Sequence, residues 1–83
     1  MEKIERVINW FDKTTEKLKG EINIDHIKLD QLKMIFSPPP DDPLMIKPFV
    51  ITQAIAEQLK QIVDIEFSFE KYDYYLECFK AEG

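Results

Sequence analysis

The segment SPPPDDPLMIKP, residues 37–48, limits the possible folds of this chain more than any other stretch. It holds all five prolines of the sequence, three of them in a row. Proline lacks a backbone N–H and fixes φ, so the segment cannot continue the helical pattern that precedes it. PxxP segments can be ligands for other domains, but in a chain of 83 residues a rigid connector with polyproline character is the better interpretation.

Two strands and a short helix are predicted before this connector. Residues 4–12, IERVINWFD, are β-branched and aromatic with partial alternation, which is typical of a strand. Residues 18–24, LKGEINI, alternate cleanly, and the short link KTTEK indicates an antiparallel hairpin. Both faces of the first strand carry apolar side chains, so it stays open whether Trp10 or Phe11 faces the core. Residues 28–36, KLDQLKMIF, have apolar residues at helical spacing.

A longer helix and a last strand are predicted after the connector. Residues 50–63, VITQAIAEQLKQIV, show helical spacing, with Thr52 as the N-cap. Residues 71–81, KYDYYLECFKA, form the last strand, whose neighbour in the sheet stays open. We therefore expect residues 1–83 to be a single α+β domain in the order ββααβ. It would have two layers, a three-stranded antiparallel sheet with two helices on one face.

The last strand has two faces of different character. One face consists of Tyr72, Tyr74, Leu76 and Cys78, and the other of Asp73, Tyr75, Glu77 and Phe79. The first set is the better core face, so the second is expected on the side away from the helices. A sheet face in water needs no tyrosine or phenylalanine, whereas aromatics beside carboxylates are typical of a binding surface. The alternative is that the aromatics are there only as good strand formers.

The charge of the chain is uneven along its length. The net charge is −5, of which residues 64–83 contribute −4 with six acids and two lysines. This distribution disfavours nucleic acid, which binds to a basic stripe, and favours a basic protein partner. The alternative is that the acids only keep a small protein soluble. No apolar run has the length of a membrane span, no signal peptide is recognisable and there is one cysteine, so we expect a cytoplasmic protein.

The sequence predicts no catalytic or metal site. His26 and Cys78 are the only candidates for a thiolate–imidazole pair, and Cys78 falls on the predicted core face. Asp41 and Asp42 lack the spacing of a calcium loop. The chain has two glycines, so it has no glycine-rich phosphate loop. We therefore expect neither an enzyme nor a bound cofactor or metal.

Four stretches carry a resemblance to known proteins: RVINWFDKTTEKLKGEI, DDPL, ITQAIAEQL and KYDYYLE. They resemble a family of small acidic bacterial proteins without assigned activity, with a W-F-D-K hairpin and a closing Y-D-Y-x-L-E strand. The turn KTTEK departs from this pattern, in which a glycine is expected, and this bears on the hairpin geometry. Proteins of this size and charge are often immunity proteins, which neutralise toxin domains delivered by competitors. The resemblance therefore implies an immunity-like function.

We accordingly expect an immunity protein or antitoxin that binds a basic toxin domain, such as a nuclease, and occludes it. The expected partner-binding residues on and before the last strand are Asp73, Tyr75, Glu77, Phe79, Glu66 and Glu70. Asp41 and Asp42 are secondary candidates, and Trp10 is a candidate anchor if it faces outward. The alternative is a homodimer, or a subunit of a larger assembly, formed through the same open face.

Overall fold

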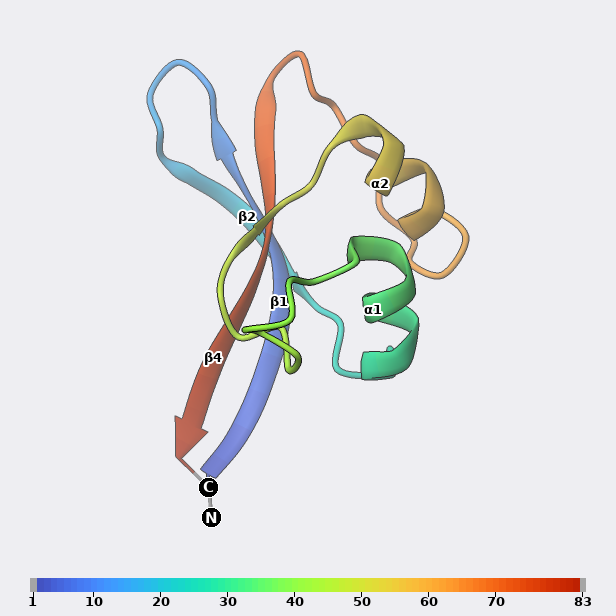
Figure 1. Cartoon of the computed structure of the whole chain (residues 1–83). Coiled ribbons are helices and arrows are strands. Elements are labelled where there is room, and N and C mark those ends of the chain that lie inside the picture. Colours follow the sequence, from blue (N-terminus) through green and yellow to red (C-terminus); the bar gives the residue numbers. More distant parts are fainter. Residues whose placement is uncertain (1, 83) are drawn as a thin grey trace.

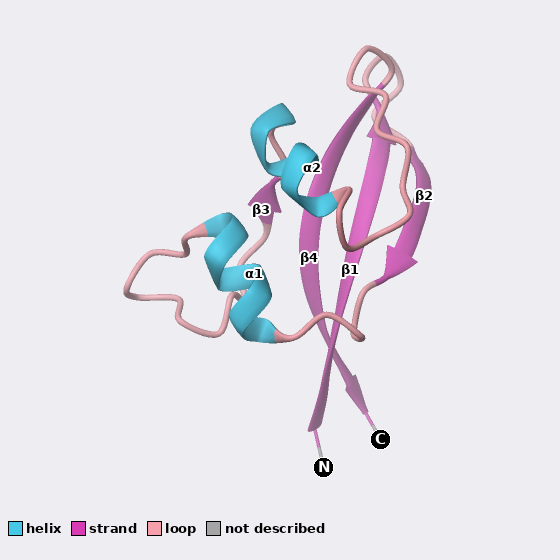
Figure 2. Ribbon diagram, turned by 90° about the vertical axis from the view of Figure 1, so that its right-hand side faces the viewer, coloured by secondary structure: helices cyan, strands magenta, loops and turns pink. Residues whose placement is uncertain are grey.

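The structure is a computed structural model that describes residues 2–82, with side chains for residues 4–79 (Figure 1). In chain order its elements are β1 Glu2–Asp12, β2 Leu18–Asn23, α1 Leu29–Phe36, β3 Phe49–Val50, α2 Gln53–Leu59 and β4 Tyr72–Glu82. The four strands form one antiparallel sheet in the order β2-β1-β4-β3. Both helices lie on the same side of this sheet (Figure 2).

The predicted α+β class is confirmed, but the three-stranded sheet in the order ββααβ is wrong. The additional strand β3 lies at the start of the segment that was assigned to the second helix. Two residues are too few to show an alternating pattern, and they form a strand because Phe49 and Val50 lie opposite Leu76 and Tyr75 of β4. The last strand is thus a central one, between β1 and β3.

Helix α2 begins later and ends earlier than predicted. The predicted N-cap is confirmed, because the Thr52 hydroxyl accepts a hydrogen bond from the Ile55 N–H at 3.2 Å. The regular helix ends at Leu59, but Val63 still donates a backbone hydrogen bond to the Leu59 carbonyl and stays buried. Helix α1 ends at Phe36 because Ser37 adopts a left-handed conformation with φ 49° and a proline follows.

The hydrophobic core lies between the sheet and the helices. Its fully buried large side chains are Ile8, Ile24, Leu32, Met45, Leu59 and Leu76. Burial of each such aliphatic side chain favours folding by roughly 1.5–3 kcal/mol. Met45 comes from the proline-rich connector, which is therefore packed into the core rather than only spanning the gap between two elements.

Trp10 is the aromatic residue of β1 that faces the core. Trp10 packs against the buried cluster, and its ring lies over the α-carbon of Gly20 on β2. A Cβ atom at Gly20 would lie 2.3 Å from Cζ2 of Trp10, so only glycine leaves room for the indole. Trp10 also contacts Tyr74, with 5.7 Å between the ring centroids. Phe11 points to the opposite side of the sheet.

Candidate interaction surface

The side of the sheet that faces away from the helices is called the open face here. Side chains alternate along each strand, and the pairing of β1 with its neighbours determines which of them share this side. Its residues are Glu5, Val7, Asn9, Phe11, Leu18, Glu21, Asn23, Val50, Asp73, Tyr75, Glu77 and Phe79. Neither α1 nor α2 covers this side (Figures 1 and 2).

The centre of the open face is closely packed. Phe11 and Tyr75 form an edge-to-face ring pair, with centroids 5.8 Å apart and an interplanar angle of 72°. Asn9 lies directly opposite Tyr75 and is only 3% exposed. Its Nδ2 donates a hydrogen bond to Oε2 of Glu77, which fixes the orientation of that carboxylate. The rings and the carboxylate are therefore held in place by contacts within the sheet.

A pocket of about 380 Å³ opens on this face. It is lined by Phe11, Asp12, Glu16, Pro48, Asp73, Tyr75 and Glu77. Two aromatic rings and a proline supply the apolar walls, and four carboxylates supply negative charge. The residues come from β1, the β1–β2 turn, the connector and β4, so four separate segments of the chain meet here.

The β1–β2 turn positions the two carboxylates at one end of the pocket. Oδ1 of Asp12 accepts hydrogen bonds from the N–H groups of Thr14 at 2.8 Å and Thr15 at 2.9 Å. These two bonds hold the pKa of the Asp12 carboxyl below its ordinary value, and the bond from Thr15 has the larger effect. Glu16 adopts a left-handed conformation with φ 61°, so the turn closes without the expected glycine.

Three of the predicted residues meet in the pocket: Asp73, Tyr75 and Glu77. Asp73 also forms an exposed ion pair with Lys13, with 3.6 Å between Nζ and Oδ1. Phe79 lies further along the open face and is exposed. The other predicted acids, Glu66 and Glu70, are exposed in the segment between α2 and β4 and do not line this pocket.

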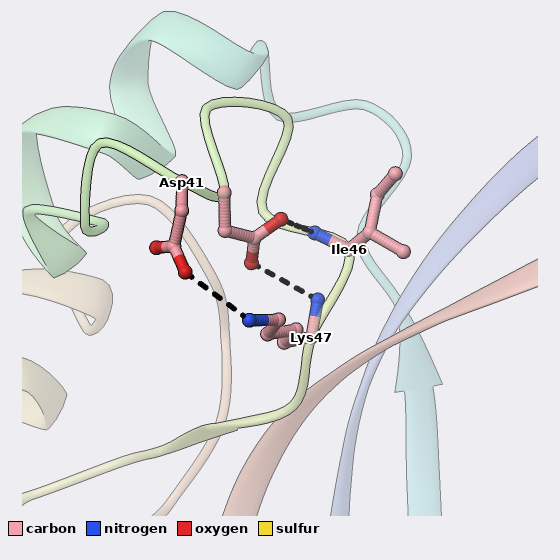
Figure 3. A network of polar contacts seen from close by, with 4 residues as sticks. Asp41, Ile46 and Lys47 are labelled. Atoms are coloured by element: carbon pink, nitrogen blue, oxygen red, sulfur yellow. Dashed lines mark hydrogen bonds and ion pairs between the residues drawn. The ribbon is translucent and has the colours of Figure 1, made fainter.

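Two predicted residues lie outside the open face and are packed into the protein instead of exposed. Trp10 was an anchor only if it faced outward, and it packs against the core instead. Asp42 is 6% exposed, and its carboxylate accepts hydrogen bonds from the N–H groups of Ile46 at 2.9 Å and Lys47 at 3.1 Å (Figure 3). The Asp42 carboxylate fixes the backbone conformation of the connector. The sequence could not show this role, because the hydrogen-bond partners of Asp42 are backbone groups.

The carboxyl of Asp42 titrates below its ordinary range. The hydrogen bond from the Ile46 N–H is the main cause of its lowered pKa, which burial opposes and the Lys47 N–H assists. Asp41 remains exposed and forms an ion pair with Lys47, at 3.5 Å between Oδ2 and Nζ (Figure 3). Of this acidic pair, only Asp41 is accessible to a partner.

The residues considered for catalysis are not assembled into a site. His26 is exposed and Cys78 is half-buried, and within residues 4–79 no hydrogen bond joins their side chains. Burial raises the pKa of the Cys78 thiol, which disfavours the reactive thiolate. The described residues contain no group of three or more His, Cys, Asp or Glu side chains that could hold a metal ion. None of the described helices has the length and hydrophobicity needed to cross a membrane.

Sequence reasoning missed Asp12, Glu16 and Pro48, which line the pocket, and Asn9, which is buried beside it. Asn9 is the one uncharged polar side chain within the apolar stretch RVINWF, and a buried amide in a strand requires a partner. Asp12 stands at the start of the predicted turn, where an aspartate typically accepts backbone hydrogen bonds from the residues that follow. For Glu16 and Pro48 no local pattern exists, because only the three-dimensional fold brings them beside β4.

Comparison with known protein families gives a match that covers most of the chain. A family described as "Domain of unknown function (DUF7683)" matches residues 5–77. This agrees with the expected likeness to a family without assigned activity, and the description contains nothing about immunity. No curated protein matches the chain.

Proposed function

The chain belongs to the DUF7683 family, and we propose that it is a binding protein whose open face docks a basic protein partner. The observation that carries this proposal is the pocket on the open face, where two aromatic rings stand among four carboxylates. Aromatic side chains supply large contact area at low entropic cost, and they dominate the binding energy of many interfaces.

The exposed apolar residues support the same surface. Leu18, Val50 and Phe79 are three of the six exposed large hydrophobic residues of the described chain, and all three lie on the open face. Exposed apolar groups that gather on one face are typical of a surface that a partner covers. Because Glu21, Asp73 and Glu77 accompany them, a basic partner fits this face better than a neutral one.

Within this class we propose an immunity protein or antitoxin of the bacterial cytoplasm. It would bind a basic toxin domain in equal stoichiometry and block it by occlusion. If the toxin is a nuclease, the carboxylates of the open face would bind the basic groups of the toxin that otherwise bind the phosphates of its nucleic acid. The small size, the net charge of −5 and the preformed pocket support this proposal.

The test is a tagged capture from the native host at low and moderate salt, followed by mass spectrometry. We expect one small basic protein at near-equal stoichiometry, with retention that weakens as salt rises. Asp73→Lys combined with Glu21→Lys should lower its affinity roughly tenfold or more, largely through slower association. Capture of a basic protein that binds this variant and the wild type equally would contradict the proposal.

The matched control is Asp30→Lys combined with Glu57→Lys. It makes the same change of charge on α1 and α2, whose side chains lie on the other side of the sheet. Glu77 is excluded from the charge reversal because its loss would leave the buried Asn9 amide without its acceptor. The melting temperature of each variant should stay close to that of the wild type, so that a change in affinity reports on the surface.

A homodimer through the same face is the second candidate function. The exposed Leu18, Val50 and Phe79 favour it, because two copies could bury these side chains against each other. The carboxylates oppose it, since a two-fold contact would bring the same acids of both copies together. The molar mass in solution as a function of concentration separates the two candidates. A dimer that strengthens with salt would favour self-association.

A further inference from the structure

We propose that the pocket of the open face is an anchor site for one arginine side chain of the partner. This inference rests on the proposed function, since it names the group by which a basic partner is recognised. It is carried by the walls of the pocket, the state of its carboxylates and an acceptor buried beside it.

The walls of the pocket have the chemistry that binds a guanidinium group. Phe11 and Tyr75 present two rings at a steep angle, and Pro48 of the connector lines the same pocket. A planar guanidinium stacks on aromatic faces and is weakly hydrated. Its desolvation in an aromatic pocket therefore costs less free energy than that of an ammonium group. The alkyl stem of the same side chain would pack against the apolar walls.

The carboxylates around the pocket are only partly neutralised within the described residues. Asp12 uses Oδ1 for the turn, and its lowered pKa keeps it ionised at neutral pH. Asp73 shares its charge with Lys13 in an ion pair that is about half exposed and therefore weak. Glu77 accepts one hydrogen bond from a neutral amide. Four carboxylates thus face two lysines, Lys13 in its ion pair and Lys19, whose charge helps to lower the pKa of Asp12, so negative charge is in excess and the pocket favours a cation.

A buried acceptor lies next to the pocket without a donor. Oδ1 of Asn9 has no hydrogen-bond partner among the described residues, although Asn9 is only 3% exposed. Asn9 stands on the pocket's side of the sheet, opposite Tyr75 and bonded to Glu77, and both of these residues line the pocket. Buried polar atoms in proteins are rarely left unpaired. The unpaired oxygen adds to the negative potential beside the pocket, which favours a ligand rich in N–H donors, and guanidinium has five.

The probe for this proposal is N-acetyl-arginine methylamide, titrated into the whole protein and followed by NMR. We expect saturable shifts at Phe11, Asp73, Tyr75 and Glu77, with weaker binding of the lysine analogue. The citrulline analogue has nearly the same shape without the charge, and it should not shift these residues. Equal shifts with citrulline or lysine, or no shifts in the pocket, would overturn the proposal.

Variants that replace one carboxylate by a neutral amide test whether the arginine probe binds in the pocket. Asp73→Asn and Glu16→Gln should each weaken arginine binding roughly two- to fivefold, as expected for partly exposed charge pairs. Asp30→Asn on α1 removes an equal charge outside the pocket and should leave the affinity unchanged. If both pocket variants bind the probe like the wild type, the proposed site is wrong.

The two proposals fail in different ways. If charge reversal on the open face weakens partner binding but the arginine probe leaves the pocket unshifted, the anchor site is refuted and the binding function stands. If the probe saturates the pocket but the native host supplies no basic partner, the anchor site is retained and the proposed function is refuted.

Discussion

Asn9 donates a hydrogen bond to the carboxylate of Glu77 across the β1–β4 pair, on the side of the sheet that no described helix covers. A buried amide on an otherwise open sheet face is held by its neighbours alone, and the carboxylate is its one hydrogen-bond partner among the described residues. This contact connects the stability of the sheet to the geometry of the pocket.

Glu77→Ala should therefore destabilise the fold by about 1–3 kcal/mol, because it leaves the Asn9 amide buried and unpaired. Urea unfolding followed by circular dichroism measures this change. Glu21→Ala is the control, since Glu21 is exposed beside Asn9 on the same face and should cost less than about 0.5 kcal/mol. A double-mutant cycle with Asn9→Ala should show coupling, and strictly additive effects would contradict the contact.

Gly20→Ala should destabilise the protein by roughly 1–3 kcal/mol, because the new methyl group would overlap the Trp10 ring. Trp10→Phe shortens the ring system and should make the Gly20→Ala substitution less costly in the double variant. Thermal unfolding of the three variants tests this coupling. If Gly20→Ala is as stable as the wild type, Trp10 does not lie over β2.

Glu16→Gly should raise stability by about 0.5–1 kcal/mol, because glycine adopts the left-handed conformation of this turn without steric cost. For a domain of this size the melting temperature should rise by roughly 2–8 °C. Glu16→Ala removes the same carboxylate but keeps the Cβ atom, so it should give no such gain. Equal melting temperatures for the two variants would argue against a left-handed residue 16.

Asp42→Asn should lower the melting temperature at neutral pH by roughly 5–10 °C, because the carboxylate organises the connector through two backbone hydrogen bonds. Asp41→Asn is the matched control, since it removes only an exposed ion pair and should leave the melting temperature almost unchanged. If the two variants have the same melting temperature, the hydrogen bonds of Asp42 do not organise the connector.

The pH dependence of Asp42 has a definite sign. Its folded pKa lies below the ordinary value of 3.8, so its contribution is complete well above pH 3.8 and is lost as the pH falls through the folded value. The difference in melting temperature between the wild type and Asp42→Asn should therefore shrink in acid. A difference that stays constant down to about pH 2 would contradict this assignment.

Local patterns were sufficient for much of the fold. The alternation of the last strand predicted that Tyr74 and Leu76 face the core and that Asp73 and Tyr75 do not, and burial confirms this. The threonine before the second helix predicted its N-cap. These features depend on residues close in sequence, whose spacing is visible in one dimension.

Contacts between distant residues could not be predicted in this way. Phe49 forms a strand only because β4 lies beside it, and Trp10 faces inward because Gly20 on another strand leaves space for the indole. The pocket joins four segments, and only its β4 residues were recognisable in the sequence. Composition therefore indicated the three residues of β4 that line the pocket, whereas the shape of the pocket depended on the tertiary structure.

The proline-rich connector inserts Met45 into the core, and the Asp42 carboxylate holds the backbone that follows it, at Ile46 and Lys47. A surface linker of this length would be an ordinary site for a protease, which needs an extended stretch of free backbone. Here such a stretch can form only when the side chain of Met45 leaves the interior. Cleavage in residues 42–47 would therefore measure how often the whole domain opens, and insertions tolerated by most loops would be rejected at this position.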